Sequence, residues 1–267
     1  MKHRPTVFDF LQDKKNNKKI SILTAYDALT AQLLERAGIH IILVGDSLGN
    51  MFSGYENTLP VTQENMIYHT QAVSRGAKES FIISDMPFLS YQISAEQARL
   101  NAGRLIKEGG AQAVKMEIHN KEGIGLVKAV IDMGIPVMGH IGFTPQSVYA
   151  LGGYKVQGKT QVEEDKFIAL AIDLEKAGCF SILMEMVPSG LAKKIAETIS
   201  IPAIGIGAGP NCDGQVLVTQ DLLGLNPNFT PKFVKKYADL GGAAAKAVEA
   251  FIKDVETGGF PDQSHTF

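Results

Sequence analysis

Acidic side chains stand directly after short apolar segments at four places in this chain. Asp46 follows the apolar residues 39–44, and Asp85, Glu117 and Glu185 end later apolar segments in the same way. A carboxylate at the end of a buried strand is costly unless a cation or a strong hydrogen-bond donor meets it. Acids gathered at one rim would also repel each other and raise one another's pKa. A divalent cation would relieve this repulsion, so the pattern predicts a metal site.

The ligand types in this pattern indicate a hard cation. Carboxylate oxygens without cysteine, and without a HExxH pair of histidines, favour magnesium, with manganese or cobalt as substitutes. For each acid taken singly, the alternative is a helix cap or a pair with a surface base. The two cysteines, Cys179 and Cys212, lie in unrelated contexts with no CxxC pattern, and we expect both to be free thiols.

Three other polar residues accompany the acids. Lys115 lies two positions before Glu117, so on a strand both side chains point to the same face, which in a closed barrel is the interior. Lys115 can hold a substrate carboxylate or form a Schiff base, and the neighbouring acids favour the first role because they keep it protonated. His140 could orient a ligand, shuttle a proton or serve as a hydrogen-bonded structural residue. Ser47 can offer its hydroxyl and nearby backbone NH groups to an oxygen of the substrate, or occupy a loop turn.

Buried strands, helices and glycine stops alternate along the chain. The expected strands are residues 20–23, 39–44, 81–85, 113–117, 136–140, 180–185, 203–206 and 215–219. The expected helices are residues 5–11, 28–37, 62–75, 95–108, 124–133, 162–177, 189–199 and 231–256. This repeat predicts a single α/β domain over residues 1–267 with a parallel sheet and a short N-terminal helix. An open doubly wound sheet is the alternative, but chemistry at the ends of five strands favours a closed (β/α)8 barrel, which brings all strand ends to one rim.

Glycine-rich segments connect some of these elements. Residues 46–61 form a long loop, and residues 141–160 combine glycines with three aromatic residues, a composition suited to a mobile cover. The glycines of residues 205–209 are spaced GxGxG rather than GxGxxG, so they indicate a dinucleotide site only weakly. A turn after the seventh strand of a barrel can instead approach an anionic or flat ligand.

Charge and hydropathy narrow the classes of partner. The 26 basic and 28 acidic residues give a net charge of −2, so no field favours nucleic acid or an anionic membrane. No apolar run approaches the roughly 20 residues needed to span a bilayer. A transit peptide is the alternative explanation of the basic beginning, but Asp9 and Asp13 argue against it. We expect a cytoplasmic protein with a small-molecule partner.

An ordered set of motifs runs through nearly the whole chain. They are Thr24-Ala-Tyr-Asp27, Gly45-Asp-Ser-Leu-Gly-Asn50, Asp85-Met-Pro-Phe88, Val114-Lys-Met-Glu117, Gly139-His-Ile-Gly-Phe-Thr-Pro-Gln146, Leu183-Met-Glu185, Gly205-Ile-Gly-Ala-Gly209 and Cys212-Asp-Gly-Gln-Val-Leu-Val218. This set resembles the ketopantoate hydroxymethyltransferase family. The resemblance implies a TIM barrel of the phosphoenolpyruvate/pyruvate type. It also implies magnesium-dependent, aldol-type transfer of a hydroxymethyl group from 5,10-methylenetetrahydrofolate to 3-methyl-2-oxobutanoate (2-oxoisovalerate). The product, 2-dehydropantoate (ketopantoate), leads to pantothenate and coenzyme A.

The same resemblance implies roles for individual positions. The implied metal ligands are Asp46, Asp85 and Glu117; the implied substrate contacts are Asp46, Ser47, Asp85 and Lys115; and the implied catalytic base is Glu185. In this mechanism the 2-oxo acid chelates Mg2+, the base takes the C3 proton, and the metal stabilises the resulting enolate. The resemblance further implies a homo-oligomer, a decamer.

Two other functions remain open on the residues alone. One is a different magnesium-dependent 2-oxo acid lyase of the same barrel type, which an assay with and without folate would separate. The other is a non-catalytic barrel that binds an oxo acid as a sensor or an assembly subunit. Glu185 argues against the second, because an inactive barrel would be free to lose the base.

Overall fold

The computed structural model describes residues 4–226 and 231–267. Two compact units divide the chain, Met1–Leu217 and Val218–Phe267, and each is described by itself. The single domain over residues 1–267 stays a prediction.

Eight parallel strands close into a barrel in the first unit, in the order of the chain, and β8 pairs with β1. They are β1 Ile20–Thr24, β2 Ile41–Val44, β3 Phe81–Asp85, β4 Ala113–Glu117, β5 Val137–Gly142, β6 Ser181–Glu185, β7 Ala203–Ile206 and β8 Gly214–Leu217. The predicted (β/α)8 barrel is therefore confirmed, with shifts of one or two residues at several strand ends.

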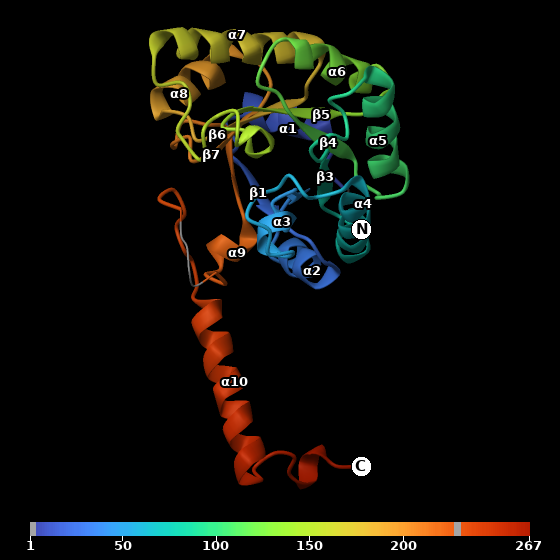
Figure 1. Ribbon diagram of the computed structural model, residues 1–267, viewed down its shortest axis with the longest axis vertical. Coiled ribbons are helices and arrows are strands. Elements are labelled where there is room, and N and C mark those ends of the chain that lie inside the picture. The colour runs from blue at the N-terminus through green and yellow to red at the C-terminus, as the bar shows by residue number, and fades with distance from the viewer. Residues whose placement is uncertain (1–3, 227–230) are drawn as a thin grey trace. The chain divides into compact units, whose positions relative to one another are not determined.

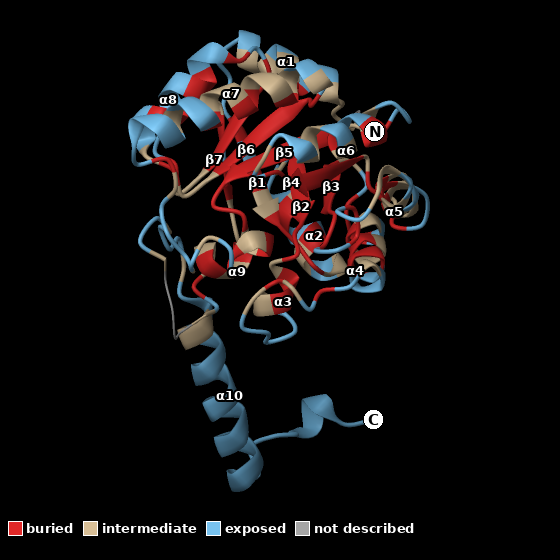
Figure 2. Ribbon diagram, turned by 45° about the horizontal axis from the view of Figure 1, so that its top comes forward, coloured by how far each residue is buried: buried red, intermediate tan, exposed pale blue. Residues whose placement is uncertain are grey.

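Helices surround these strands (Figure 1). They are α1 Val7–Lys15, α2 Ala28–Arg36, α3 Leu48–Met51, α4 Gln63–Gly76, α5 Ala95–Lys107, α6 Glu122–Ile131, α7 Gln161–Ala177 and α8 Ser189–Thr198. The side chains of Asp27 and Ser94 cap α2 and α5, because they accept hydrogen bonds from the amides of Thr30 and Gln97. Burial concentrates on the strands and on the helix faces that cover them (Figure 2).

The interior of the barrel is apolar at its N-terminal end. Ile83 and Phe81 on β3 are two residues apart and pack in the same buried cluster, as expected for one face of a strand. Phe10 of α1 closes this end, with its ring 5.2 Å from that of Phe81 in an edge-to-face arrangement. Burying one such side chain is worth about 1.5–3 kcal/mol. Polar chemistry is thus confined to the other end, where the strands finish.

Two segments expected to be loops contain ordered helical turns. Residues 46–61 include α3, a helix too short to show a periodic pattern in the sequence. Residues 141–160 begin with the end of β5 and then form the 3-10 helix η1, Pro145–Ser147. Phe143, Thr144 and Gln146 are buried, so the prediction of a cover is wrong for this first half. The mobility of the exposed remainder stays a prediction.

The second unit contains two α-helices among its described residues, α9 Thr219–Leu222 and α10 Leu240–Thr257, and the 3-10 helix η2 Gln263–His265. The helix predicted over residues 231–256 begins later, because the amides of Tyr237 and Leu240 donate to the carbonyls of Leu222 and Leu223 instead. Asp239 then caps α10 through a 3.1 Å bond from the amide of Gly242. None of the helices in residues 4–226 and 231–267 is both long and apolar enough to cross a membrane.

Candidate active site

The alternation of the strands carries polar side chains onto the inner face at the C-terminal end of the barrel. Strand register then decides which of them are neighbours. Asp85 on β3 is paired with Lys115 on β4, and Glu117 on β4 is paired with His140 on β5. Asp85, Lys115, Glu117 and His140 are buried, and Glu185 ends β6 beside them with 17% of its side chain exposed.

Lys115 is the cation at the centre of this group. Its Nζ lies 3.1 Å from Oδ2 of Asp85, 3.9 Å from Oε1 of Glu117 and 3.2 Å from Nδ1 of His140. Burial alone disfavours the charged ammonium, but the carboxylates of Asp85, Glu117 and Asp46 outweigh it and raise the pKa of Lys115 above its usual value. Lys115 is therefore protonated and suited to holding an anion.

In the buried acids, unlike in Lys115, the effect of burial on the pKa outweighs the effect of the opposite charge. Burial raises the pKa of Asp85 to about 7, although the charge of Lys115 pulls it down. Burial likewise raises the pKa of Glu117 well above its ordinary value and that of Glu185 to about 8. One lysine therefore does not neutralise the group, and a further positive charge bound here would stabilise the ionised carboxylates.

Asp46 and Ser47 follow β2 and reach the same rim. The amide of Asp46 donates a 2.9 Å hydrogen bond to Oδ2 of Asp85, which ties the turn after β2 to the end of β3. The hydroxyl of Ser47 lies 2.8 Å from that of Tyr26, a buried residue after β1. A Cβ on Gly45 would come within 2.7 Å of Oγ of Ser47, so this tight turn requires glycine.

Gln146 connects the acids to one another. Its Nε2 donates 2.9 Å hydrogen bonds to Oδ2 of Asp46 and to the carbonyl of Met86, and its amide N donates to Oε2 of Glu117 at 2.9 Å. Its Oε1 accepts a 3.1 Å bond from the hydroxyl of Tyr91. One amide side chain, supplied by the turn after β5, thus fixes two carboxylates that lie 71 positions apart in the numbering of this chain.

His140 stands between Lys115 and Glu185. Burial and the charge of Lys115 lower its pKa well below the ordinary value, so the imidazole is neutral. Because the ammonium of Lys115 donates to Nδ1, the ring proton belongs on Nε2, which lies 3.4 Å from Oε2 of Glu185. His140 orients Lys115 on one side and faces the candidate base on the other.

The acid group fits a hard divalent cation in its chemistry. Oδ1 of Asp85 and Oε1 of Glu117 are buried and have no hydrogen-bond partner within the described residues, an arrangement that a bound cation would stabilise. Within residues 4–226 and 231–267, no cluster of three or more His, Cys, Asp or Glu side chains is arranged to hold a metal by itself. Mg2+ commonly takes only one or two carboxylates and completes its shell with water and substrate oxygens. The assignment of Asp46, Asp85 and Glu117 as ligands stays a prediction.

Sequence reasoning identified the acids and the lysine but not Gln146, Tyr91 or Tyr26. Gln146 ends the motif of residues 139–146, yet an amide side chain in a loop belongs to no periodic pattern that would reveal its partners. Tyr91 donates from its buried hydroxyl to the carbonyl of Glu117 at 2.9 Å. The signal available for Tyr26 was its place just after β1, where other strands carry functional side chains.

The remaining candidates have structural explanations. Cys179 and Cys212 are free and buried, as expected, and burial raises the pKa of their thiols to about 12 and about 11. In the glycine-rich turn after β7, Gly209 has a φ of +82°, and a Cβ there would lie 2.5 Å from Cβ of Ser189. This glycine is required by packing against α8, whatever else the turn contacts.

The family model and the related proteins that match this chain point to the same family. A family model described as ketopantoate hydroxymethyltransferase matches residues 4–263. A Clostridium beijerinckii protein named 3-methyl-2-oxobutanoate hydroxymethyltransferase is 52% identical over 262 residues, which cover 98% of this chain and 95% of that protein. A protein of the same name from Geobacter metallireducens is 49% identical, with 100% of each chain covered.

Solved structures support the barrel type. A crystal structure of 2,3-dimethylmalate lyase, a member of the PEP mutase/isocitrate lyase superfamily, aligns with a TM-score of 0.63 at 16% identity, covering 98% of this chain and 93% of that one. A phosphonopyruvate hydrolase crystallised with oxalate and Mg2+ also gives a TM-score of 0.63, at 14% identity, covering 95% of this chain and 88% of that one. At these identities the likeness concerns the fold alone, which is the predicted (β/α)8 TIM barrel.

Proposed function

The chain belongs to the ketopantoate hydroxymethyltransferase family of enzymes, and we propose that it transfers a hydroxymethyl group from 5,10-methylenetetrahydrofolate to 3-methyl-2-oxobutanoate. The product would be 2-dehydropantoate, on the route to pantothenate and coenzyme A. One observation carries the proposal beyond the family name: a partly exposed acid, Glu185, stands beside a buried and protonated Lys115 in a group of carboxyl groups. This arrangement can hold an acidic substrate and remove a proton from it.

Lys115 and Ser47 are proposed to bind the carboxylate of the 2-oxo acid. Lys115 supplies a charge that three acids keep protonated, and Ser47 supplies a hydroxyl whose position is set by Tyr26. The neutral His140 holds the ammonium from the side. An ammonium fixed by several partners loses little conformational freedom when the substrate arrives, which favours binding.

Asp46, Asp85 and Glu117 would hold Mg2+, with Gln146 keeping Asp46 and Glu117 in place. The bound ion would supply a Lewis acid that draws electrons from the keto oxygen, stabilises the enolate of the substrate and so makes the C3 proton more acidic. Oδ1 of Asp85 and Oε1 of Glu117, which accept no hydrogen bond from the described residues, support this assignment.

Glu185 is proposed to take the C3 proton. Burial raises its pKa to about 8, so its ionised form is a stronger base than an exposed carboxylate, and the charges of Lys115 and of a bound cation would favour that ionised form. Its backbone is fixed because the amide of Phe143 donates to its carbonyl at 2.8 Å. Water would cleave the two C–N bonds of the methylene group, which releases tetrahydrofolate and formaldehyde. The deprotonated C3 then adds to the formaldehyde carbon, and the formaldehyde oxygen takes a proton to become the hydroxyl.

We also propose an oligomeric state and a cellular location for the enzyme. Family membership supports a homo-oligomer, a decamer, in the cytoplasm, and the net charge of −2 gives no reason to expect a nucleic acid or membrane partner.

The test is a product assay with 2-oxoisovalerate, Mg2+ and 5,10-methylenetetrahydrofolate. We expect 2-dehydropantoate only when folate and the metal are both present. Exchange of the C3 proton with deuterated water should require the metal but not folate. Cleavage of a 2-oxo acid without folate would instead identify a lyase, and absence of both exchange and product would refute the proposal.

A further inference from the structure

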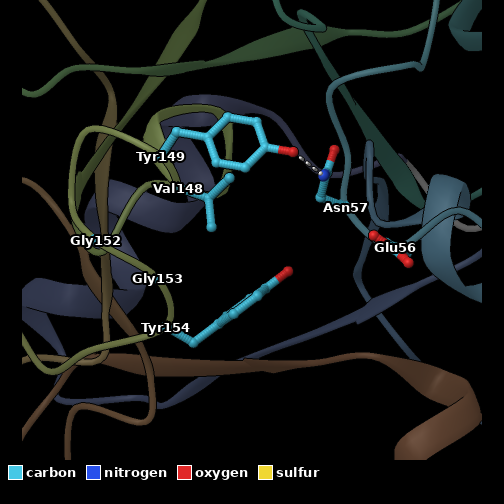
Figure 3. A pocket seen from close by; sticks show the side chains of 7 residues that line it. All are labelled: Glu56, Asn57, Val148, Tyr149, Gly152, Gly153 and Tyr154. Atoms are coloured by element: carbon cyan, nitrogen blue, oxygen red, sulfur yellow. Dashed lines mark hydrogen bonds between the residues drawn. The ribbon is translucent and has the colours of Figure 1, made fainter.

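A hollow opens at the rim of the barrel between two long connections (Figure 3). Its volume is about 290 Å3, and it is lined by Val148, Tyr149 and Tyr154 from the segment after β5, by Glu56 and Asn57 from the segment after α3, and by the backbone of two glycines. This volume lies at the lower end of the range for small-molecule pockets. It suits one flat ring system better than a whole large ligand.

Tyr154 places this hollow next to the acid group. Its ring centroid lies 5.0 Å from that of Phe143, whose amide is bonded to the carbonyl of Glu185. Burial raises the pKa of Tyr154, and so do the charges of Glu185 and Asp46, which shows that the phenol lies within electrostatic reach of the candidate base. A ligand seated against Tyr154 would extend toward the atoms that react.

The lining has the chemistry of a site for a flat heteroaromatic ring. Figure 3 shows the rings of Tyr149 and Tyr154 on opposite sides of the hollow, with Asn57 and Glu56 at one end. Tyr149 is 77% exposed and Tyr154 58%, and Figure 3 shows the two rings steeply inclined to each other, so a flat ligand that stacks on one ring meets the other at its edge. Aromatic side chains bind flat heterocycles in this way.

The polar end of the hollow, formed by Glu56 and Asn57, can bind the hydrogen-bonding edge of such a ring. The side-chain carboxylate of Glu56 has no hydrogen bond or ion pair with any residue in the described part of the chain. A carboxylate accepts two hydrogen bonds at once from adjacent N–H donors. A 2-amino-4-oxopyrimidine ring presents such a pair at its amino edge, and a pterin contains that ring.

We propose that this hollow binds the pterin ring of the folate donor, in contact with the rings of Tyr149 and Tyr154 and with its amino edge toward Glu56. The inference rests on the proposed function and adds the site of the second substrate. The hydrogen bond from Nδ2 of Asn57 to the hydroxyl of Tyr149, 3.2 Å long, joins the two connections across the rim and holds the Tyr149 ring in place.

The experiment measures the dissociation constant of tetrahydrofolate by calorimetry, with Mg2+ and 2-oxoisovalerate present. In Tyr149→Leu and Tyr154→Leu we expect binding to weaken about fivefold to a hundredfold through lost stacking. Glu56→Gln should also weaken it, since an amide cannot accept both N–H bonds. Tyr154→Phe keeps the ring and should stay close to the unmodified chain. Tyr68→Leu removes a tyrosine that is 66% exposed on α4 and should change nothing.

Exchange of the C3 proton, measured in the same variants without folate, separates this inference from the proposed function. It should remain at the unmodified rate in Tyr149→Leu and Glu56→Gln, because neither residue is assigned to the 2-oxo acid; Tyr154, which packs on Phe143 beside Glu185, is left out of this comparison. Unchanged tetrahydrofolate affinity in both leucine variants and in Glu56→Gln would overturn the inference while leaving the proposed function intact. An unmodified chain that exchanges the proton but does not bind tetrahydrofolate would overturn the donor assignment itself.

Discussion

Replacement of Lys115 by methionine tests the electrostatic description of the site. The side chain keeps nearly its length, but the ammonium 3.1 Å from Asp85 and 3.9 Å from Glu117 is lost. Breaking a buried ion pair in this way typically costs about 3–5 kcal/mol, because a charge is left without a partner. The variant should also lose binding of 2-oxoisovalerate.

The loss of stability in Lys115→Met should depend on pH in a defined direction. Asp85 has a pKa of about 7 in the folded chain, above the usual value of an aspartate, and loss of Lys115 raises that pKa further. Well below pH 7 the carboxyl is protonated in both proteins, so the loss of the ammonium costs little. Above pH 7 the carboxyl group of Asp85 in the variant is either a buried charge without a partner or stays protonated. Staying protonated costs about 1.4 kcal/mol per pH unit. The penalty therefore grows as the pH rises.

Urea unfolding at pH 6 and pH 9 in metal-free buffer measures the difference. Lys128→Met is the matched control, since Lys128 forms an exposed pair with Asp132 at 2.8 Å, and such pairs are worth about 0–1 kcal/mol. We expect Lys115→Met to lose several times more stability at pH 9 than at pH 6, and the control to change little at either. A penalty independent of pH, or one as small as that of the control, would refute the reasoning.

Three further predictions follow from the contacts. Asp85→Asn should weaken Mg2+ binding about tenfold or more in calorimetry, since one anionic oxygen ligand is lost; unchanged affinity would remove Asp85 from the metal site. Gln146→Leu should lower the free energy of unfolding by about 3 kcal/mol, because Asp46 and the carbonyl of Met86 lose their buried donors; a loss below 1 kcal/mol in urea unfolding would contradict the bridging role. Borohydride added with 2-oxoisovalerate should leave the protein mass unchanged, because Lys115 is protonated; a stable adduct there would indicate a Schiff base.

The barrel and its reactive end were predictable because they depend on local patterns. Apolar segments that end in Asp85, Glu117 and Glu185 indicate strands, and the two-residue period places Lys115 on the same face as Glu117. Short helices such as α3 contain too few residues for any period.

The partners of each side chain depend on features that no local pattern contains. Lys115 meets Asp85 because β3 and β4 are in a particular register, which closure of the barrel sets. Gln146 reaches Asp46 and Glu117 only after the chain turns at Gly142, whose φ is +95°. The α10 boundary was missed because Asp239 provides a cap that the alanine-rich pattern outweighed.

The most direct test of the account is C3 proton exchange in Glu185→Gln. The replacement is nearly isosteric, so Mg2+ and 2-oxoisovalerate should bind as before. Removal of a general base typically costs about 10² to 10⁴ in rate, and we expect exchange and hydroxymethyl transfer to fall by the same factor because both require loss of the C3 proton. If exchange in the variant runs at the unmodified rate while transfer is lost, Glu185 does not take that proton, and the central claim is wrong.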